Sequence, residues 1–246
     1  MVNWINNYFL ILKLQFLRMK TTLPFFCILQ IMIGIGASIG ISYYVPVRTP
    51  EVTAYIATGV PTITLLTIGM TLLPQSIASD RDKGIIDYIW TLPVSRVCYL
   101  LADLSVWLLT CIPGIIISLL FGANHYNLNY DYSFELIFVY LLTALCSCLF
   151  GYAIANLFSN SQIVLLICNF LIFSLFLFSP IAYSIEQLPK WLQKVHEFLP
   201  IIYMADMIRD TLLDVGKYEM SKSYSVVLIW TVLCFIITVK VMYRKK

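Results

Sequence analysis

Long apolar blocks separated by short polar segments dominate the chain. Six of these blocks approach or exceed the ~20 residues that an α-helix needs to cross about 30 Å of hydrocarbon. They cover Leu23–Tyr44, Val52–Ile77, Val97–Phe121, Phe134–Phe158, Ile163–Tyr183 and Tyr224–Met242. The pattern predicts an all-α polytopic membrane protein with six transmembrane helices, and we take residues 1–246 as a single transmembrane domain.

A short amphipathic helix is predicted in the loop after the second span, within residues 79–96. Ser79 or Asp80 can cap its first turn with a side-chain oxygen, and Pro93 ends it because a proline pushes the preceding residue out of the α region. Its apolar positions recur at helical spacing; they are Ile85, Ile86, Ile89 and Trp90. An apolar face at this place requires either the lipid interface or a protein partner.

Two further segments have amphipathic character. Residues 1–22 predict a helix that lies on the membrane surface, with Lys13, Arg18 and Lys20 toward the headgroups; the alternative is a plain flanking segment before the first span. Residues 184–223 predict two short helices, divided at Pro200, that partly enter the membrane as re-entrant elements on the outer side.

Charge is scarce and unevenly placed. Only 12% of the residues are charged, about half of what a soluble domain carries, and the net charge of +3 includes no run long enough for nucleic-acid binding. The positive-inside rule, applied to the short loops, favours a cytoplasmic N-terminus and a cytoplasmic C-terminus. The residues assigned to the cytoplasm are Lys13, Arg18, Lys20, Arg81, Lys83, Arg96, Lys240, Arg244, Lys245 and Lys246; those assigned outside are Arg48, Lys190, Lys194, Arg209, Lys217 and Lys222.

The sequence contains no recognisable catalytic or nucleotide-binding motif. Its two histidines, His125 and His196, are distant from each other, and there is no glycine-rich phosphate loop. The seven cysteines fall in spans or at their ends, which is typical of small thiols in helix packing; they are Cys27, Cys98, Cys111, Cys146, Cys148, Cys168 and Cys234. We therefore expect no catalytic residue, no metal site and no bound cofactor.

Glycines, prolines and one aspartate inside the spans are candidates for helix packing, helix kinks and a buried charge. Gly36 and Gly40 are spaced to let another helix approach closely. Pro61 and Pro113 are candidates for helix kinks. Asp103 lies about 9 Å into the third span, so it is either a functional charge or a residue that pairs with Arg96 or Lys83 near the headgroups.

Together these residues resemble the ABC-2 type permeases, the membrane subunits of ABC exporters, here of a type V-like kind. The best local match runs from Asp82-Lys83-Gly84-Ile85-Ile86 to Thr91-Leu92-Pro93-Val94-Ser95-Arg96. A second match runs from Leu199-Pro200-Ile201-Ile202-Tyr203 to Arg209. The chain departs from the family at Asp103, where a lysine is frequent, and at Leu199, where an asparagine is frequent; these departures concern the subfamily.

The resemblance implies a separate ATPase subunit, which binds the ATP, and two copies of each subunit per transporter as a homodimer or heterodimer. The helix near Ile85 would be the coupling helix, and the coupling residues would be Asp82, Gly84, Ile85, Ile86, Ile89, Trp90, Pro93 and Arg96. Burying its four apolar side chains on the ATPase would contribute at most roughly 6–12 kcal/mol before association costs. Ile89→Asp or Trp90→Ala is then expected to release the ATPase.

The scarcity of charge in the spans favours export of an apolar or amphipathic cargo, such as a drug, a peptide or a lipid-linked molecule, across the cytoplasmic membrane. Phe170, Phe173 and Phe176 in the fifth span could line the path, or they could face lipid or core. Two other classes stay open: a channel or scaffold, and a membrane enzyme that modifies lipids. Neither of them requires an ATPase partner.

Overall fold

The computed structural model describes residues 4–44 and 49–244, so Arg48, Lys245 and Lys246 of the charge comparison lie outside the described residues. In chain order the elements are α1 (Trp4–Met19), α2 (Leu23–Tyr44), α3 (Pro50–Thr67), the π-helical turn η1 (Ile68–Leu72), α4 (Leu73–Asp82), α5 (Ile85–Thr91), α6 (Arg96–Tyr126), α7 (Phe134–Leu157), α8 (Ser161–Phe178), the 3-10 turn η2 (Ile185–Gln187), α9 (Lys190–Phe198), α10 (Pro200–Leu213) and α11 (Met220–Arg244).

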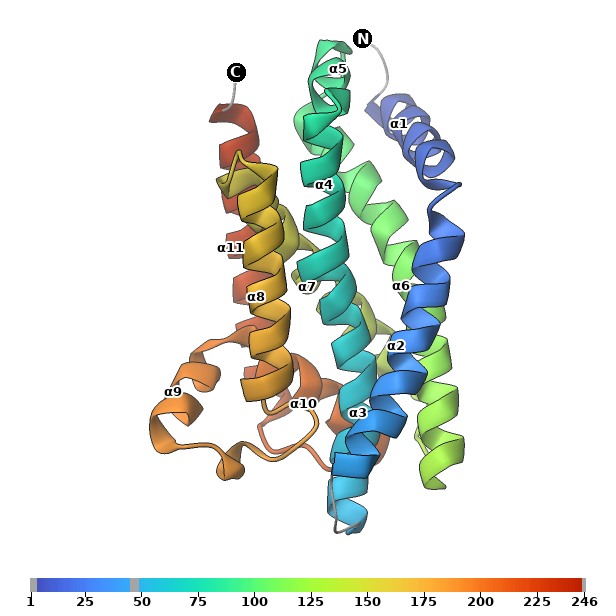
Figure 1. Cartoon of the computed structure of the whole chain (residues 1–246), viewed down its shortest axis with the longest axis vertical. Coiled ribbons are helices and arrows are strands. Elements are labelled where there is room, and N and C mark those ends of the chain that lie inside the picture. The colour runs from blue at the N-terminus through green and yellow to red at the C-terminus, as the bar shows by residue number, and fades with distance from the viewer. Residues whose placement is uncertain (1–3, 45–48, 245–246) are drawn as a thin grey trace.

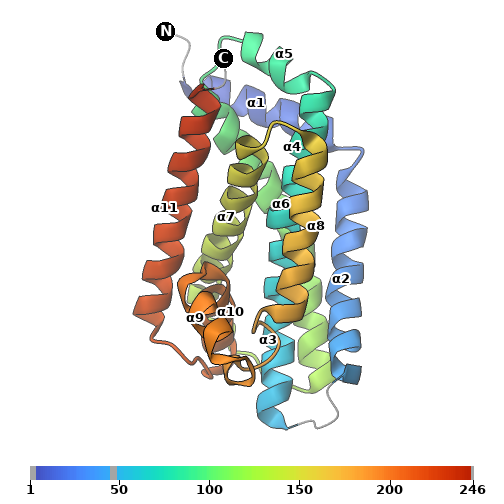
Figure 2. The same ribbon diagram turned by 60° about the vertical axis from the view of Figure 1, so that its left-hand side comes forward.

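Within the described residues, six helical segments are long and apolar enough to cross a membrane, which confirms the predicted all-α fold with six spans. They are α2, the continuous α3–η1–α4 segment, α6, α7, α8 and α11. Figures 1 and 2 show these helices side by side, with α1, α5 and the last turn of α11 at one end of the bundle, called here the α5 end. Helices α9 and α10 lie toward the opposite end, called here the α9 end.

The second span forms the centre of the bundle. Every residue from Ala54 to Thr71 is buried, and the span packs against α2, α6, α7, α8 and α10. Pro61 and Pro113 lie inside uninterrupted α-helices. The departure from α geometry occurs instead at η1, just before Pro74: the N–H of Leu73 donates to the carbonyl of Ile68, five residues back. Because Pro74 has no N–H for the usual bond, the wider turn relieves the mismatch.

Glycine lets α7 cross this wider turn at close range. A Cβ atom added to Gly151 would lie 1.8 Å from the carbonyl oxygen of Gly69 and 3.0 Å from Cδ of Pro74. A Cβ atom added to Gly69 would lie within 2.6 Å of backbone and side-chain atoms of Ser147. The backbones of the second and fourth spans therefore touch, as small residues allow in membrane proteins.

Within the described part of this chain, no other helix approaches Gly36 or Gly40 closely. Nothing lies within 4 Å of a Cβ atom added to either residue. Helix α2 instead turns Gly34 toward α6, where an added Cβ would meet Ser118 at 3.5 Å. The hydroxyl of Ser38 is tied to the carbonyl of Gly34 at 2.8 Å, so the small-residue face is shifted by two positions from the one predicted.

The fifth span is shorter than predicted. Helix α8 ends at Phe178 and not at Tyr183, because Pro180 prevents the helix from continuing. The irregular segment 179–182 that follows is buried. A non-helical backbone at membrane depth requires protein cover and internal hydrogen-bond partners, and this segment receives both from α3 and α10.

Candidate functional site

Helix α5 is the element that the sequence singled out, and its start differs from the prediction. Helix α4 continues through Ser79 and Asp80 to Asp82, so neither residue caps α5. The break comes at Gly84, whose φ of 70° lies in the left-handed region that glycine adopts without strain. Helix α5 then ends before Leu92 and Pro93, as predicted.

The apolar face of α5 is directed toward its own chain. Ile89 is 1% exposed, and Ile85, Ile86 and Trp90 are partly buried against the same core. In this conformation Ile89 is therefore covered by its own chain and is not accessible to a partner. The hydrophobic free energy of this face holds α5 on the bundle, while Tyr88 is 63% exposed on the outer side.

Arg96 joins three elements at the α5 end. Its guanidinium lies 5.0 Å from the ring centroid of Trp90 in α5 and 5.5 Å from that of Tyr243 in α11. It also donates to the carbonyl of Met242. Trp90 in turn packs edge-on against Tyr99 of α6, with ring centroids 5.3 Å apart. These contacts fix the far end of α5 to α6 and α11.

Arg81 and Asp82 attach the end of α4 to the turn between α7 and α8. The Arg81 guanidinium donates to the carbonyls of Ala155 at 2.6 Å and Phe158 at 2.7 Å, where the last carbonyls of α7 lack helical partners. The carboxylate of Asp82 accepts from the hydroxyl of Ser161 at 2.5 Å. Asp82, predicted as a coupling residue, thus positions the start of α8.

A partly buried ionic cluster joins α1, α4, α6 and α7. Arg18 lies 2.9 Å from the Asp80 carboxylate and 3.9 Å from that of Asp103. Asp103 is 1% exposed; it accepts from the Gln15 amide at 2.8 Å and from the Tyr152 hydroxyl. The predicted pairing of Asp103 with Arg96 or Lys83 is wrong, because Asp103 is directed into the bundle and not toward the headgroups.

Helix α1 therefore directs Arg18 toward the bundle, whereas the sequence predicted that Arg18 faces the headgroups. Ile11, Gln15 and Met19 are its buried residues, and Arg18 points inward beside Gln15. Burial opposes the charge on Arg18, but Tyr99, Asp80 and Asp103 outweigh this effect and keep the pKa of the guanidinium above its ordinary value. Sequence periodicity did not predict that Gln15, Arg18 and Tyr152 surround Asp103. The signal for such partners was the charge of Asp103 inside a span.

Replacing Arg18 by glutamine is expected to destabilise the protein by about 2 kcal/mol, which corresponds to a fall of roughly 4–8 °C in melting temperature. The effect is smaller than for a fully buried pair because Arg18 and Asp80 both reach solvent. Thermal unfolding of the detergent-solubilised protein measures it. Lys13→Gln, which removes the same charge from an exposed position of α1, is the control.

Adding Asp80→Asn to Arg18→Gln restores the original balance of charge in the cluster, since one positive and one negative group are then absent together. We expect the double variant to recover part of the lost melting temperature. A melting temperature of Arg18→Gln equal to that of Lys13→Gln would show that the cluster contributes nothing to stability.

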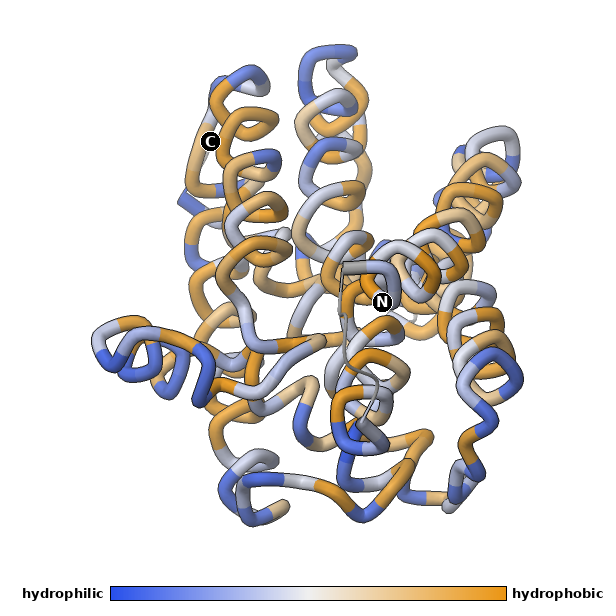
Figure 3. The backbone as a smooth tube through the Cα atoms, turned by 60° about the horizontal axis from the view of Figure 1, so that its bottom comes forward, coloured by the Kyte–Doolittle hydropathy of each residue, from blue (hydrophilic) through white to orange (hydrophobic). Residues whose placement is uncertain are grey.

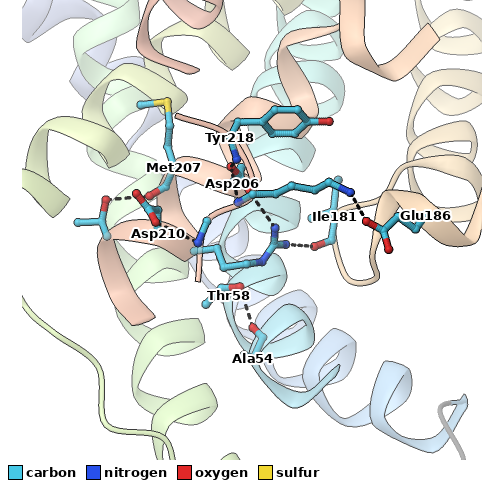
Figure 4. A network of polar contacts seen from close by, with 12 residues as sticks. Ala54, Thr58, Ile181, Glu186, Asp206, Met207, Asp210 and Tyr218 are labelled. Atoms are coloured by element: carbon cyan, nitrogen blue, oxygen red, sulfur yellow. Dashed lines mark hydrogen bonds and ion pairs between the residues drawn. The ribbon is translucent and has the colours of Figure 1, made fainter. Parts of the chain in front are cut away.

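A second polar network lies at the α9 end and involves α10, which carries the other predicted motif (Figure 4). Arg209 is buried; it lies 3.3 Å from the Asp206 carboxylate, donates to the carbonyl of Ile181 at 2.9 Å and stacks 3.7 Å from the ring centroid of Tyr55. The prediction that placed Arg209 on the outer side did not foresee its burial. Arg209 thus supplies a hydrogen-bond donor to the carbonyl of Ile181 in the irregular segment after α8.

The same network holds the turn that leads into α11. Asp206 accepts from the backbone N–H of Lys217 at 3.0 Å and of Tyr218 at 2.8 Å. The side chain of Lys217 forms an exposed ion pair with Glu186 at 2.5 Å, and this hydrogen bond lowers the pKa of Glu186. Figure 4 shows how α10, the segment at Ile181 and the turn before α11 meet at Asp206.

The aromatic residues predicted as a possible cargo path all belong to α8. Phe170, Phe173 and Phe176 are exposed along α8, and Phe176 borders an apolar cavity of about 400 Å³ between α8 and the second span. All seven cysteines are free thiols, buried except for Cys27, which is half-buried. Within residues 4–44 and 49–244, no group of three or more His, Cys, Asp or Glu side chains could hold a metal ion.

The helices and networks define a multi-pass membrane protein in which a short helix at one end is tied to several transmembrane helices. The chain belongs to the ABC-2 transporter family, because the family sequence model described as ABC-2 family transporter protein matches residues 42–240. This confirms the resemblance noted in the sequence and makes the chain the membrane domain of an ABC permease, a generally non-catalytic subunit whose family works with ABC ATPases. No curated protein matched the chain.

Proposed function

We propose that this permease is the membrane subunit of an exporter that is driven by a separate ABC ATPase bound at the α5 end. The observation that carries the proposal is the attachment of α5. Its apolar face is anchored in its own bundle through Ile89, while its polar face remains exposed at the end of the central span. A helix held in this way can transmit a movement without bending away from the bundle.

The contacts around α5 support a route for that movement. Arg81 and Asp82 join the end of α4 to α7 and α8. Asp80 joins α4 to α1 through Arg18, which also approaches α6. A displacement of α5 that moves the end of α4 would thus reach α6, α7 and α8 through polar contacts. These contacts are the physical basis for transmission, because each one connects a rigid element to the next.

The contact surface for the ATPase is proposed on the outward side of α5. Asp87, Tyr88, Thr91 and Pro93 are exposed there. Beside them lies a cavity of about 560 Å³ between α5 and the ends of α7 and α11, bordered by Asp87, Trp90 and Arg244 among other residues. A partner with one projecting side chain and a polar rim fits this surface, since aromatic anchors surrounded by polar contacts are typical of protein interfaces.

Tyr88→Ala is expected to reduce co-purification of the ATPase at least tenfold while leaving the melting temperature of the permease unchanged. A loss of about 1.4 kcal/mol produces a tenfold effect, and one central tyrosine commonly contributes more than this. Ile89→Asp should lower both co-purification and melting temperature, because it detaches α5 from the bundle. Pull-down with a tagged ATPase, together with thermal unfolding, separates the two effects.

Tyr132→Ala is the matched control, because Tyr132 is equally exposed but lies in the connection between α6 and α7, toward the α9 end. It should leave ATPase binding unchanged. Normal ATPase recovery with both Tyr88→Ala and Asp87→Arg would reject this face of α5 as the contact surface.

The same proposal sets the orientation. With the ATPase in the cytoplasm, α1, α5 and the end of α11 lie on the cytoplasmic side of the cell membrane, and α9 and α10 lie outside. The charge distribution supports this choice, since Lys13, Lys20 and Arg244 belong to the α5 end. A membrane-impermeant thiol reagent applied to cells that carry Tyr88→Cys tests the orientation. We expect no labelling of this cysteine in intact cells and labelling after permeabilisation.

An apolar or amphipathic cargo is proposed, carried by two permease copies. The exposed aromatic side chains of α8 and the apolar cavity beside them support this class of cargo, because they offer no paired charges for an ionic one. Stimulation of ATP hydrolysis by the reconstituted complex, measured across drugs, peptides and lipid-linked molecules, identifies the cargo.

A further inference from the structure

Helix α9 extends sideways from the bundle and exposes apolar side chains. Trp191 is 68% exposed, Val195 47% and Phe198 73%. They are spaced four and three residues apart, so they share one side of the helix. Figure 3 shows α9 as a separate projection with both hydrophobic and hydrophilic positions.

The opposite side of α9 is the one that meets the bundle. His196 is buried there, and burial lowers the pKa of its imidazole, so it is neutral near pH 7. Leu192 and Gln193 beside it are half-buried. Trp191 and Val195 are therefore left exposed after α9 has packed, and Phe198, also largely exposed, touches the bundle only at its edge.

One contact sets the depth of α9 along the spans. The indole N–H of Trp230 donates to the carbonyl of Phe198 at 3.1 Å, and the two rings pack edge-on with centroids 5.7 Å apart. Trp230 lies ten residues after Met220, the first residue of α11, or about 15 Å along the helix. It falls within the apolar stretch that begins at Tyr224. Phe198 thus lies level with the apolar part of α11 and not with its polar first turn.

Charged residues occupy the third side of α9. Lys190 and Lys194 are four residues apart, and both are exposed. Their long apolar stems let the ammonium groups reach phosphates while the helix stays at the edge of the hydrocarbon. Apolar residues with an aromatic member on one side and lysines on the next are typical of helices that lie in the membrane interface.

We propose that α9 binds phospholipids of the leaflet at the α9 end, with Trp191, Val195 and Phe198 among the acyl chains and Lys190 and Lys194 at the headgroup phosphates. The helix would fix the position of the permease in that leaflet and hold η2 and α10 beside it. This proposal requires that the chain spans a membrane, but it does not require an ATPase partner. Either this proposal or the exporter proposal can therefore fail while the other holds.

Fluorophores at two positions test the proposal in full-length permease in vesicles of phosphatidylcholine and phosphatidylglycerol in equal parts. An NBD group on Val195→Cys reports the apolar side, and one on Glu197→Cys reports the charged side; Cys27→Ser removes the half-buried native thiol. We expect brominated acyl chains to quench the label at position 195, with protection from iodide. At position 197 we expect the reverse.

The lysines are tested with the label at position 195. Brominated phosphatidylglycerol should quench this label better than brominated phosphatidylcholine, and Lys190→Gln with Lys194→Gln should reduce the advantage by up to about fivefold per lysine. An advantage that does not change in the double variant would overturn the headgroup contact.

Two other outcomes would overturn the proposal as a whole. Iodide quenching of both labels would show that α9 stands in water. Protection of the label at position 195 from both lipid and iodide, with disulfide cross-linking of Val195→Cys between copies, would show that a second permease covers this side.

Discussion

Replacing Arg209 by methionine is expected to destabilise the permease by about 4 kcal/mol, the largest effect that we predict for a side chain. The substitution leaves the buried carboxylate of Asp206 without its cation and the carbonyl of Ile181 without its donor. Breaking a buried pair in this way costs about 3–5 kcal/mol. The melting temperature of the purified permease should therefore fall by roughly 8–16 °C.

Two further variants show whether the cause is the unpaired carboxylate. Adding Asp206→Asn to Arg209→Met removes the uncompensated charge and should recover part of the stability, although the carbonyl of Ile181 remains unsatisfied. Lys217→Met breaks only the exposed pair with Glu186 and should change the melting temperature little. The explanation is wrong if the double variant is less stable than Arg209→Met alone.

Replacing Gly151 by alanine is expected to destabilise the permease by about 3 kcal/mol, a large effect for one methyl group. The new Cβ would lie 1.8 Å from the carbonyl oxygen of Gly69, and the obstacle is backbone, which cannot rotate out of the way as a side chain does. Helix α7 must then move away from η1, and the packing around Ser147 is lost with it. Thermal unfolding should show a fall of roughly 6–12 °C.

The same substitution at Gly40 is the control. Gly40 also lies in a transmembrane helix, but nothing is within 4 Å of an added Cβ. Gly40→Ala should leave stability unchanged or raise it slightly, because alanine favours the helix over glycine. Equal melting temperatures for Gly151→Ala and Gly40→Ala would mean that the second and fourth spans are not in backbone contact.

The glycines show what the sequence could not predict about helix packing. Gly36 and Gly40 have the spacing of a packing motif, while Gly69 and Gly151 are far apart in the chain and have no motif. Their meeting depends on the π-turn before Pro74 and on how α7 crosses it. Neither the turn nor the crossing can be read from a hydrophobic pattern, since the pattern specifies burial and not the neighbour.

The α5 region shows the same limit at the candidate site. The helix, its apolar face and its end at Pro93 follow from the sequence. The pattern could not distinguish an apolar face buried in a partner from one buried in its own bundle, because both remove the same surface from water. Ile89 proved to be an anchor within the chain, and the exposed Tyr88 became the candidate for the partner contact.

The sequence by itself determined the six spans, the short helix after the second span and the family. Lipid offers the backbone no hydrogen bonds, so long apolar blocks must become helices wherever they later pack. Only the tertiary structure decided that Arg18 meets Asp80 and Asp103, that Arg209 supports the backbone at Ile181, and that α9 keeps a free apolar side. Such partners lie on different helices, and their pairing depends on the rotation and depth of each helix in the bundle.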